Sequence, residues 1–168
     1  MNNKETRFLE LIEQNKGILF KICRIYQDDP ADRDDLTQEM ILQLWQVFDS
    51  FRGESKISSW MYRVALNTAI TFFKKQKRRP DNEQLPENFE QLQDRHDESG
   101  TEQRLALFHQ ALKHLNKVEK ALIFLYMENQ SSEEIAASLG ITAINVRVRL
   151  NRTKNKLKEL IKNTDHGY

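Results

Sequence analysis

Hydrophobic residues recur along this chain at intervals of three and four residues, the spacing of α-helices with one buried face. Two segments show the pattern clearly, and they lie at positions 36–51 and 105–115. Their apolar positions are Leu36, Met40, Leu44, Val47 and Phe51, then Leu105, Phe108, Leu112 and Leu115. Gly and Pro are scarce, and no two alternating segments are joined by a hairpin signal. The pattern therefore predicts an all-α protein.

One segment without a helical period divides the chain. Residues 80–101 contain two prolines, seven acidic residues and one basic residue. This composition is typical of an extended segment that forms no core of its own. We therefore predict two small helical domains, residues 1–79 and 102–168, joined by an acidic flexible linker. Domains of this size bury a modest fraction of their surface, which leaves room for stabilisation by partners.

Charge is sorted along the chain, although its net value is only +1 over 168 residues. Acidic residues gather at positions 27–39, whereas basic residues dominate positions 67–79 and 147–162. Two separate basic helices suggest two contacts with one polyanion. The alternative is that each basic stretch is a solvated helix face.

Several features bear on where the protein acts. The sequence has no apolar run of about 18 residues, so we expect no membrane insertion. Residues 1–15 lack the apolar core of a secretion signal. The single cysteine, Cys23, cannot form an internal disulfide, and its aliphatic neighbours favour a role as buried filler over one as a redox sensor. We therefore expect a cytoplasmic protein.

Residues 131–154 carry the signals of two helices joined by a tight turn. Ser131 and Glu134 have the spacing of a capping box, so a helix should begin there. Gly140 is suited to a left-handed cap at its end, and Thr142 can cap the next helix. These signals predict a helix-turn-helix from Ser131 to Asn151.

The second of these helices divides into two faces at 100° per residue. Four residues share the inward face: Val146, Leu150, Thr153 and Leu157. The outward face and its flanks carry Asn145, Arg147, Val148, Arg149, Asn151, Arg152, Asn155 and Lys156. Arg and Asn suit base edges and phosphates in a major groove, and Val148 suits a thymine methyl group. The alternative is an ordinary helical hairpin with a solvated basic face.

The preceding segment, residues 105–130, is expected to supply supporting helices. Leu122, Leu125 and Tyr126 continue an apolar face, and Asn129 is suited to end the second helix in the left-handed conformation. His109 and His114 are five residues apart, which is not the spacing of a helical metal pair. We interpret both histidines as surface residues.

A mixed apolar and polar face opposes the buried face of the helix near residues 34–51. It comprises Asp35, Gln38, Glu39, Leu42 and Trp45. An aromatic anchor with an apolar neighbour and a polar rim is typical of a protein–protein contact. The alternative for Trp45 is packing under an N-terminal helix through Phe8, Leu11 and Ile12. Catalysis is not indicated, because no His or Cys accompanies the acids and no Gly-rich phosphate loop is present.

A polar loop and a long helix follow this segment. The helix is predicted to begin near Ser58 or Ser59, and one stripe along it is polar and then basic. The stripe comprises Arg63, Asn67, Thr71, Lys74, Lys75 and Arg78. Such a stripe can follow a phosphate backbone, while Asn67 and Thr71 reach bases. The loop, with Arg52 and Lys56, is suited to hold an unstacked base from a single strand.

These motifs, in this order, resemble those of bacterial RNA polymerase sigma factors, specifically the small two-domain extracytoplasmic-function group. The resemblance covers about residues 8–162 and rests on four features. They are DDLTQEMILQLW at 34–45, FRGESKISSWMYRVALN at 51–67, the basic run to position 79 with the acidic linker, and ENQSSEEIAASLGITAINVRVRLNRTKNKL at 128–157.

The resemblance implies a role for each part. Asp35, Gln38, Glu39, Leu42 and Trp45 match the helix that docks on the clamp helices of the polymerase largest subunit, and the flap is a further contact. The loop at 52–59 and the helix after it match the part that recognises and melts the −10 promoter element. The helix-turn-helix matches the module that reads the −35 element. The resemblance implies binding to double- and single-stranded promoter DNA, a possible anti-sigma protein, no cofactor and no enzymatic activity.

Six positions depart from the pattern of the family. Asn116, Asn129 and Ile57 replace a usual Pro, a common Gly and a frequent Phe, and these changes look structurally tolerable. Ile144, Val148 and Asn151 replace a small residue, a frequent Ser and a frequent His or aromatic residue. Because these three lie on the DNA face, the −35 sequence cannot be inferred from relatives.

Two other functions remain as alternatives. The first is a conventional helix-turn-helix regulator whose N-terminal domain senses a ligand or dimerises, which leaves residues 35–45 and the second basic helix without a role. The second is a helical metal-dependent hydrolase, which requires carboxylates from paired helices together with His.

Overall fold

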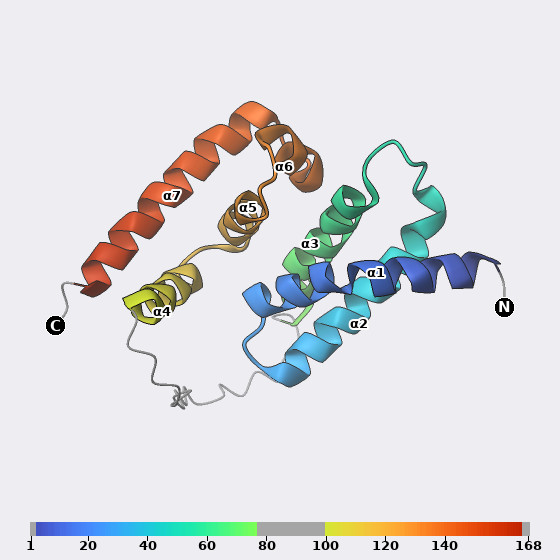
Figure 1. Ribbon diagram of the computed structural model, residues 1–168, viewed down its shortest axis with the longest axis horizontal. Helices are drawn as coiled ribbons and strands as arrows, with labels where there is room; N and C mark the ends of the chain where they lie inside the picture. The colour runs from blue at the N-terminus through green and yellow to red at the C-terminus, as the bar shows by residue number, and fades with distance from the viewer. Residues whose placement is uncertain (1–2, 77–99, 166–168) are drawn as a thin grey trace.

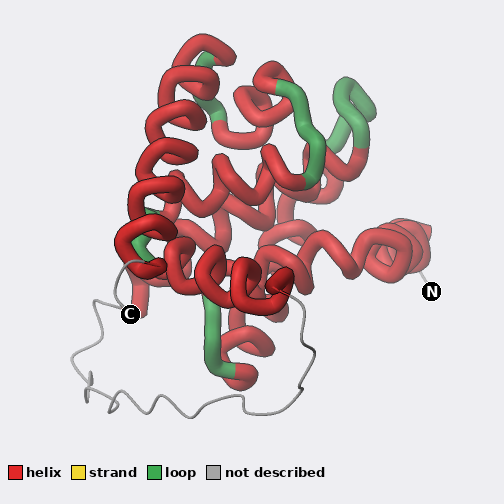
Figure 2. Tube along the Cα trace, turned by 60° about the vertical axis from the view of Figure 1, so that its left-hand side comes forward, coloured by secondary structure: helices red, strands yellow, loops and turns green. Residues whose placement is uncertain are grey.

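The computed structural model describes residues 3–76 and 100–165, and every regular element in these two ranges is helical (Figures 1 and 2). The N-terminal lobe contains α1 (Asn3–Tyr26), α2 (Pro30–Val47), the short 3-10 helix η1 (Phe48–Ser50) and α3 (Ile57–Gln76). The C-terminal lobe contains α4 (Gly100–Lys113), α5 (Lys117–Met127), α6 (Ser132–Leu139) and α7 (Ala143–Asp165). The prediction of an all-α protein with two helical lobes is confirmed.

The starts of α3 and α4 can be compared with the sequence pattern. α3 begins at Ile57, beside the expected start at Ser58 or Ser59. α4 begins at Gly100, so residues 100 and 101 of the predicted linker are helical. Linker residues 80–99 lie outside the described residues.

The core of the N-terminal lobe forms where α1, α2 and α3 pack against one another. Leu36, Met40 and Leu44 of α2 are completely buried, as their spacing predicts. Val47 and Phe51, which continue the same series, are only half-buried because they lie where α2 gives way to η1 and the loop.

Side-chain caps define the short helices of the C-terminal lobe. Asn116 accepts hydrogen bonds from the amides of Val118 and Glu119 at the start of α5. Ser131 and Glu134 form the predicted capping box at the start of α6. Each box satisfies backbone N–H groups that a helix leaves without partners in its first turn.

The predicted turn between α6 and α7 is also present. Gly140 ends α6 with φ of +68°, a conformation that costs glycine little because it has no Cβ. The Asn145 amide donates to the Thr142 hydroxyl at 3.2 Å, so Thr142 caps α7. Asn129, after α5, has φ of +57°, as expected for a left-handed cap.

Two residues of the C-terminal lobe are more exposed than their spacing suggests. Leu105, predicted on the apolar face of the first helix, is 54% exposed, because the buried residues of this segment lie at its other end, at Ala111 and Leu115. Tyr126 is 46% exposed, and its ring is covered by the Lys154 ammonium at 3.5 Å from the centroid.

The two lobes contact each other through α3, which packs against α5 and α6 (Figure 1). The Tyr62 ring meets the Phe124 ring edge to face at 5.8 Å, and its hydroxyl donates to Glu128 at 3.1 Å. Lys21 of α1 donates to the same carboxylate at 2.9 Å. Burial, together with the Glu128 charge, raises the pKa of Tyr62.

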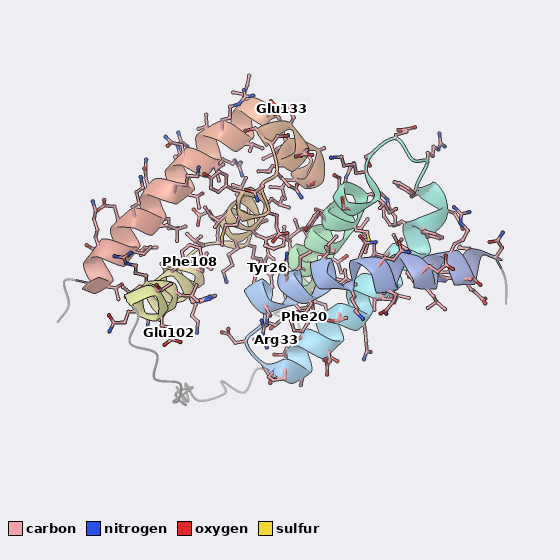
Figure 3. The ribbon with its side chains drawn as sticks, viewed as in Figure 1. Phe20, Tyr26, Arg33, Glu102, Phe108 and Glu133 are labelled. Atoms are coloured by element: carbon pink, nitrogen blue, oxygen red, sulfur yellow. The ribbon has the colours of Figure 1, made fainter. Side chains whose placement is uncertain are left out.

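Tyr26 adds a further contact between the lobes. It lies at the end of α1 nearest α5 (Figure 3), and its hydroxyl donates to the Lys117 carbonyl at 2.6 Å. Glu128 and Tyr26 therefore fix α5 against the N-terminal lobe from two places. None of the described helices is long and apolar enough to cross a membrane.

Candidate protein and nucleic-acid interfaces

A groove of about 490 Å³ runs between α1 and α2. Leu9 and Leu42, 54% and 47% exposed, belong to its apolar lining. The full lining comprises Glu5, Phe8, Leu9, Gln38, Ile41, Leu42 and Trp45. The groove thus contains three of the five residues predicted for a protein–protein contact, and it adds residues from α1. Exposed aliphatic side chains with a polar rim are suited to bind a partner helix or loop.

Trp45 packs under the N-terminal helix, as one of its two interpretations expects, and it also lines the groove. Its ring packs edge to face against Phe8 of α1 at 5.1 Å, and the Lys4 ammonium lies 4.4 Å from its centroid. The same side chain lines the groove and is partly exposed. Trp45 therefore packs α1 against α2, and part of its side chain remains exposed in the groove.

The two acids of the predicted contact lie away from this groove. Asp35 is exposed near the start of α2. Glu39 accepts a hydrogen bond from Gln43 at 3.0 Å and lines a separate depression between α2 and α3, together with Asn67 and Thr71. The predicted face is therefore broad, with an apolar groove on one side and an acid facing α3 on the other.

A second pocket, of about 500 Å³, lies between the loop after η1 and the start of α3. Phe51 and Trp60 line it with ring centroids 5.2 Å apart. Arg52, Arg63 and Asn67 of the predicted set also line the pocket. Aromatic walls beside cationic and amide groups are suited to receive an unstacked base with its phosphate.

The other predicted residues of this region are placed differently. Lys56 projects from the loop toward the C-terminal lobe, with its ammonium 3.8 Å from Glu134 of α6. The exposed Thr71 donates its hydroxyl to the Asn67 carbonyl at 2.9 Å. Lys74 and Lys75 belong to α3, but their side chains are not described, and Arg78 lies outside the described residues.

The faces of α7 agree with the predicted helix-turn-helix. Val146, Leu150, Thr153 and Leu157 are buried. The outward positions Val148, Asn151, Arg152, Asn155 and Lys156 are exposed, whereas Asn145 is half-buried. Ile144, in the first turn of α7, is 72% exposed and lies on the same side as Val148.

Several basic residues of α7 already have partners within the chain. Arg147 donates to Glu133 of α6 at 2.6 Å, at the α6–α7 corner marked by the Glu133 label in Figure 3. Arg149 donates from Nε to the Asn145 Oδ1 atom at 2.9 Å. Arg149 and Arg152 also line a cleft of about 860 Å³ at the junction of the lobes.

Lys156 has a structural partner as well. It donates to Glu119 at 2.9 Å, and Glu119 in turn accepts from the Asn116 amide in the capping box of α5. Partial burial would raise the pKa of Glu119, but these two hydrogen bonds outweigh burial and lower it. Lys156 thereby joins α7 to the start of α5.

The remaining candidate residues are His109, His114 and Cys23. His109 and His114 are exposed, as expected. Cys23 is buried, which confirms the expectation of a core position, and burial raises the pKa of its thiol. Within residues 3–76 and 100–165, no three His, Cys, Asp or Glu side chains gather as a metal-binding group would.

Tertiary packing brings into these surfaces two residues, Leu9 and Trp60, that the sequence pattern did not identify. Trp60 lines the loop pocket, and Leu9 lines the α1–α2 groove. The available sequence signal for Leu9 was an apolar residue outside the apolar face of an amphipathic helix. Trp60 had no comparable signal, because an aromatic residue at the start of a helix is equally suited to the core.

Two protein-family models match separate parts of the chain. Residues 11–79 match the family model described as Sigma-70 region 2, and residues 105–157 match the model described as Sigma-70, region 4. The first match covers the loop pocket and the α2 side of the groove, whereas the groove residues Glu5, Phe8 and Leu9 lie before it. The second covers α5, α6 and the outward face of α7.

Curated relatives are similar along most of the chain. The RNA polymerase sigma-E factor of Streptomyces avermitilis is 29% identical over 94% of this chain and 87% of its own length. The RNA polymerase sigma factor SigZ of Bacillus subtilis is 28% identical over 83% of this chain and 78% of its own.

Two solved structures share the fold. One is CnrH in complex with the cytosolic domain of CnrY, with a TM-score of 0.66 and 21% identity over 94% of this chain and 89% of that one. The other is the sigma factor RpoE of Bartonella quintana in complex with the anti-sigma factor NepR. Its TM-score is 0.69, with 22% identity over 96% of this chain and 98% of that one.

Proposed function

Because the chain belongs to the sigma-70 family of RNA polymerase sigma factors, in its extracytoplasmic-function group, we propose that its two lobes position core polymerase on a promoter in two steps of recognition. The chain is a transcription initiation factor that directs polymerase to specific promoters. It supplies specificity rather than bond-making chemistry, and it acts in the cytoplasm, where the polymerase is.

The α1–α2 groove is assigned to core polymerase. Leu42 and Leu9 offer apolar area, Trp45 offers an aromatic edge, and Gln38 offers a hydrogen-bonding rim. Asp35 and Glu39 extend the contact on its polar side. This arrangement fits the clamp helices of the largest subunit, and the C-terminal lobe is assigned to the flap.

The loop pocket and α3 are assigned to the −10 element. Phe51 and Trp60 provide stacking surfaces, and Arg63 and Asn67 provide groups for a phosphate and a base edge. Melting then follows from capture of an unstacked base, because a strand that is held open cannot pair again. No nucleotide cofactor is needed for this step. Thr71, Lys74, Lys75 and Arg78 continue along the strand, with Arg52 and Lys56 on the loop side.

The helix-turn-helix is assigned to the −35 element. The residues proposed to face the major groove are Asn145, Val148, Asn151 and Arg152, and Arg147 and Arg149 flank them. Lys156 of α7 holds the helix against α5 through its hydrogen bond to Glu119. The observation that carries the proposal is the presence of both an aromatic-walled loop pocket and an exposed recognition helix on one chain. Joint attachment to polymerase raises the effective concentration of each weak contact.

An anti-sigma protein is a further partner in this proposal. Both structural neighbours are complexes with a second protein, one of which is named as an anti-sigma factor. A conventional helix-turn-helix regulator accounts for α6 and α7 but leaves the groove and the loop pocket without a role.

Transcription in vitro with core polymerase, followed by mapping of start sites, tests the proposal. The wild-type chain should produce defined start sites that core enzyme alone does not. Leu42→Asp should weaken binding to core polymerase about tenfold or more, because a charge then occupies the apolar groove. Leu105→Asp is the matched control, since Leu105 is also an exposed leucine, 54% against 47% for Leu42, but lies on α4. Equal binding by both variants would reject the groove as the docking site.

A further inference from the structure

Two large aliphatic side chains are exposed on the outward face of α7. Ile144 is 72% exposed and Val148 is 45% exposed. They lie four residues apart, so one helical turn separates them and they form a single apolar patch. Asn151, also exposed, continues this face at the next turn. Most other large aliphatic side chains of α5, α6 and α7 are buried or half-buried. An exposed aliphatic patch on such a helix is typical of a binding surface.

Cationic side chains lie around the patch rather than on it. Arg147 is drawn toward α6 by Glu133 at 2.6 Å, and Arg149 is drawn along the helix by Asn145 at 2.9 Å. Arg152 lies to one side, where it lines the cleft between the lobes. The outward face of α7 therefore has an aliphatic centre and a positively charged rim.

This distribution fits duplex DNA. The positive rim is complementary to phosphates on either side of a groove. Ile144 and Val148 are the second and sixth residues of α7, and the N-terminal residues of a recognition helix are the ones that reach base edges. Aliphatic side chains make no hydrogen bonds with bases, so the group that they can select in the major groove is the C5-methyl of thymine. A protein partner would cover the aliphatic patch equally well, but it would not account for the cationic rim.

We propose that Ile144 and Val148 are specificity-determining residues for the −35 element and select thymine by contact with its C5-methyl group. This inference rests on the proposed function, because it concerns the DNA site of the same helix. Four residues of helix span about 6 Å and a base-pair step about 3.4 Å, so the two contacts lie within about two base-pair steps. The preferred −35 element therefore carries thymine at one or two positions under the patch.

Holoenzyme formed from core polymerase and this chain provides the test. Preferred −35 sequences are first selected from a promoter library that is randomised at that element. Each selected thymine is then replaced by deoxyuridine, which lacks only the methyl group. Loss of one buried methyl contact should weaken promoter binding about fourfold. In Ile144→Ser and Val148→Ser holoenzymes, the same replacement should have no effect at the position that the altered side chain contacts. Both residues are exposed, so the substitutions leave the core intact.

Leu105→Ser is the matched control, because Leu105 is an exposed aliphatic residue on α4. It should retain the full response to deoxyuridine. If elements are selected but deoxyuridine has no effect at any position, the inference is wrong while the proposed function stands. If deoxyuridine weakens binding equally in wild type and in both serine variants, the methyl contact belongs to other residues, and the assignment is wrong. If no element is selected and no start site is defined, the proposed function fails, and this inference fails with it.

Discussion

Gly17 and Gly140 show how one residue type meets two different backbone requirements. Gly17 lies inside α1, whereas Gly140 ends α6 with φ of +68°. A Cβ at either position would meet no atom within 4 Å. Any effect of adding a methyl group must therefore come from the backbone, and the two sites should respond with opposite sign.

We expect Gly140→Ala to lower the free energy of unfolding by about 1–2 kcal/mol, because an L-residue is strained in the left-handed region. Gly17→Ala should raise it by about 0.5–1 kcal/mol, because alanine loses less entropy in a helix. Urea denaturation followed by circular dichroism measures both. A loss of stability at both sites would mean that packing, rather than backbone conformation, decides these positions.

Arg152 is an exposed cation on the outward side of α7. We expect Arg152→Ala to weaken holoenzyme binding at a −35 element about tenfold, as for the loss of one good contact with a base or phosphate. Lys162→Ala is the control on the same helix, since Lys162 lies near its end and pairs with Glu159. Titration of labelled promoter DNA gives both affinities. Equal loss in the two variants would indicate a general charge effect rather than a contact made by Arg152.

At the scale of elements, α5 and α6 depend on capping boxes that contain ionised glutamates. Hydrogen bonds from the Ser131 amide and hydroxyl lower the pKa of Glu134, and those from Lys156 and the Asn116 amide lower the pKa of Glu119 despite its partial burial. A carboxyl group whose pKa is lower in the folded state stabilises that state above its ordinary pKa. The stabilisation is lost as pH falls through the folded-state pKa.

We therefore expect the C-terminal lobe to become less stable as pH falls below about 4.3, the ordinary pKa of glutamate. Glu119→Gln should reduce this dependence on pH, because glutamine keeps a hydrogen-bond acceptor but does not titrate. Thermal denaturation between pH 7 and pH 3 gives the midpoints for wild type and variant. The interpretation fails if the two midpoints fall in parallel over the whole range.

At the scale of the whole molecule, the two lobes are held together by apolar packing and by hydrogen bonds between them. The Lys56 ammonium in the loop after η1 lies 3.8 Å from Glu134 of α6. The positions −10 and −35, which the proposed function assigns to the two lobes, differ by about 25 base pairs, or roughly 85 Å of duplex at 3.4 Å per step. Both elements cannot be bound while this contact persists, so the lobes must separate when the proposed function is performed.

Glu128 lies where the two lobes meet and accepts hydrogen bonds from both Lys21 and Tyr62. We expect Glu128→Ala to shift the free chain toward separated lobes by roughly tenfold, the effect of losing charge-assisted hydrogen bonds. Energy transfer between dyes on α1 and α7 should decrease, while helix content stays unchanged. Glu159→Ala removes an exposed carboxylate from α7 and should have no effect. An unchanged distance in Glu128→Ala would show that apolar contacts such as Tyr62 with Phe124 suffice to hold the lobes.

The local features of this protein could be predicted from its sequence. Ser131, Gly140 and Thr142 act through atoms a few residues away, so their capping roles follow from spacing alone. The burial of Leu36, Met40 and Leu44 follows from helical periodicity. Leu105 and Tyr126 are exceptions, because periodicity identifies a face but does not say how far along a helix its neighbour extends.

Contacts between distant residues were decided by the tertiary structure. Leu9 joins Leu42 in one groove because α1 crosses α2 beside it, and Trp60 joins Phe51 because the loop folds back on α3. Glu128 meets Lys21 and Tyr62 only because the lobes pack together. Helix periodicity is a property of neighbours in sequence, whereas the angle and register at which two helices cross depend on the summed packing of many side chains. The sequence by itself therefore determined the helices, their caps and the outward faces, and packing decided which of those faces meet.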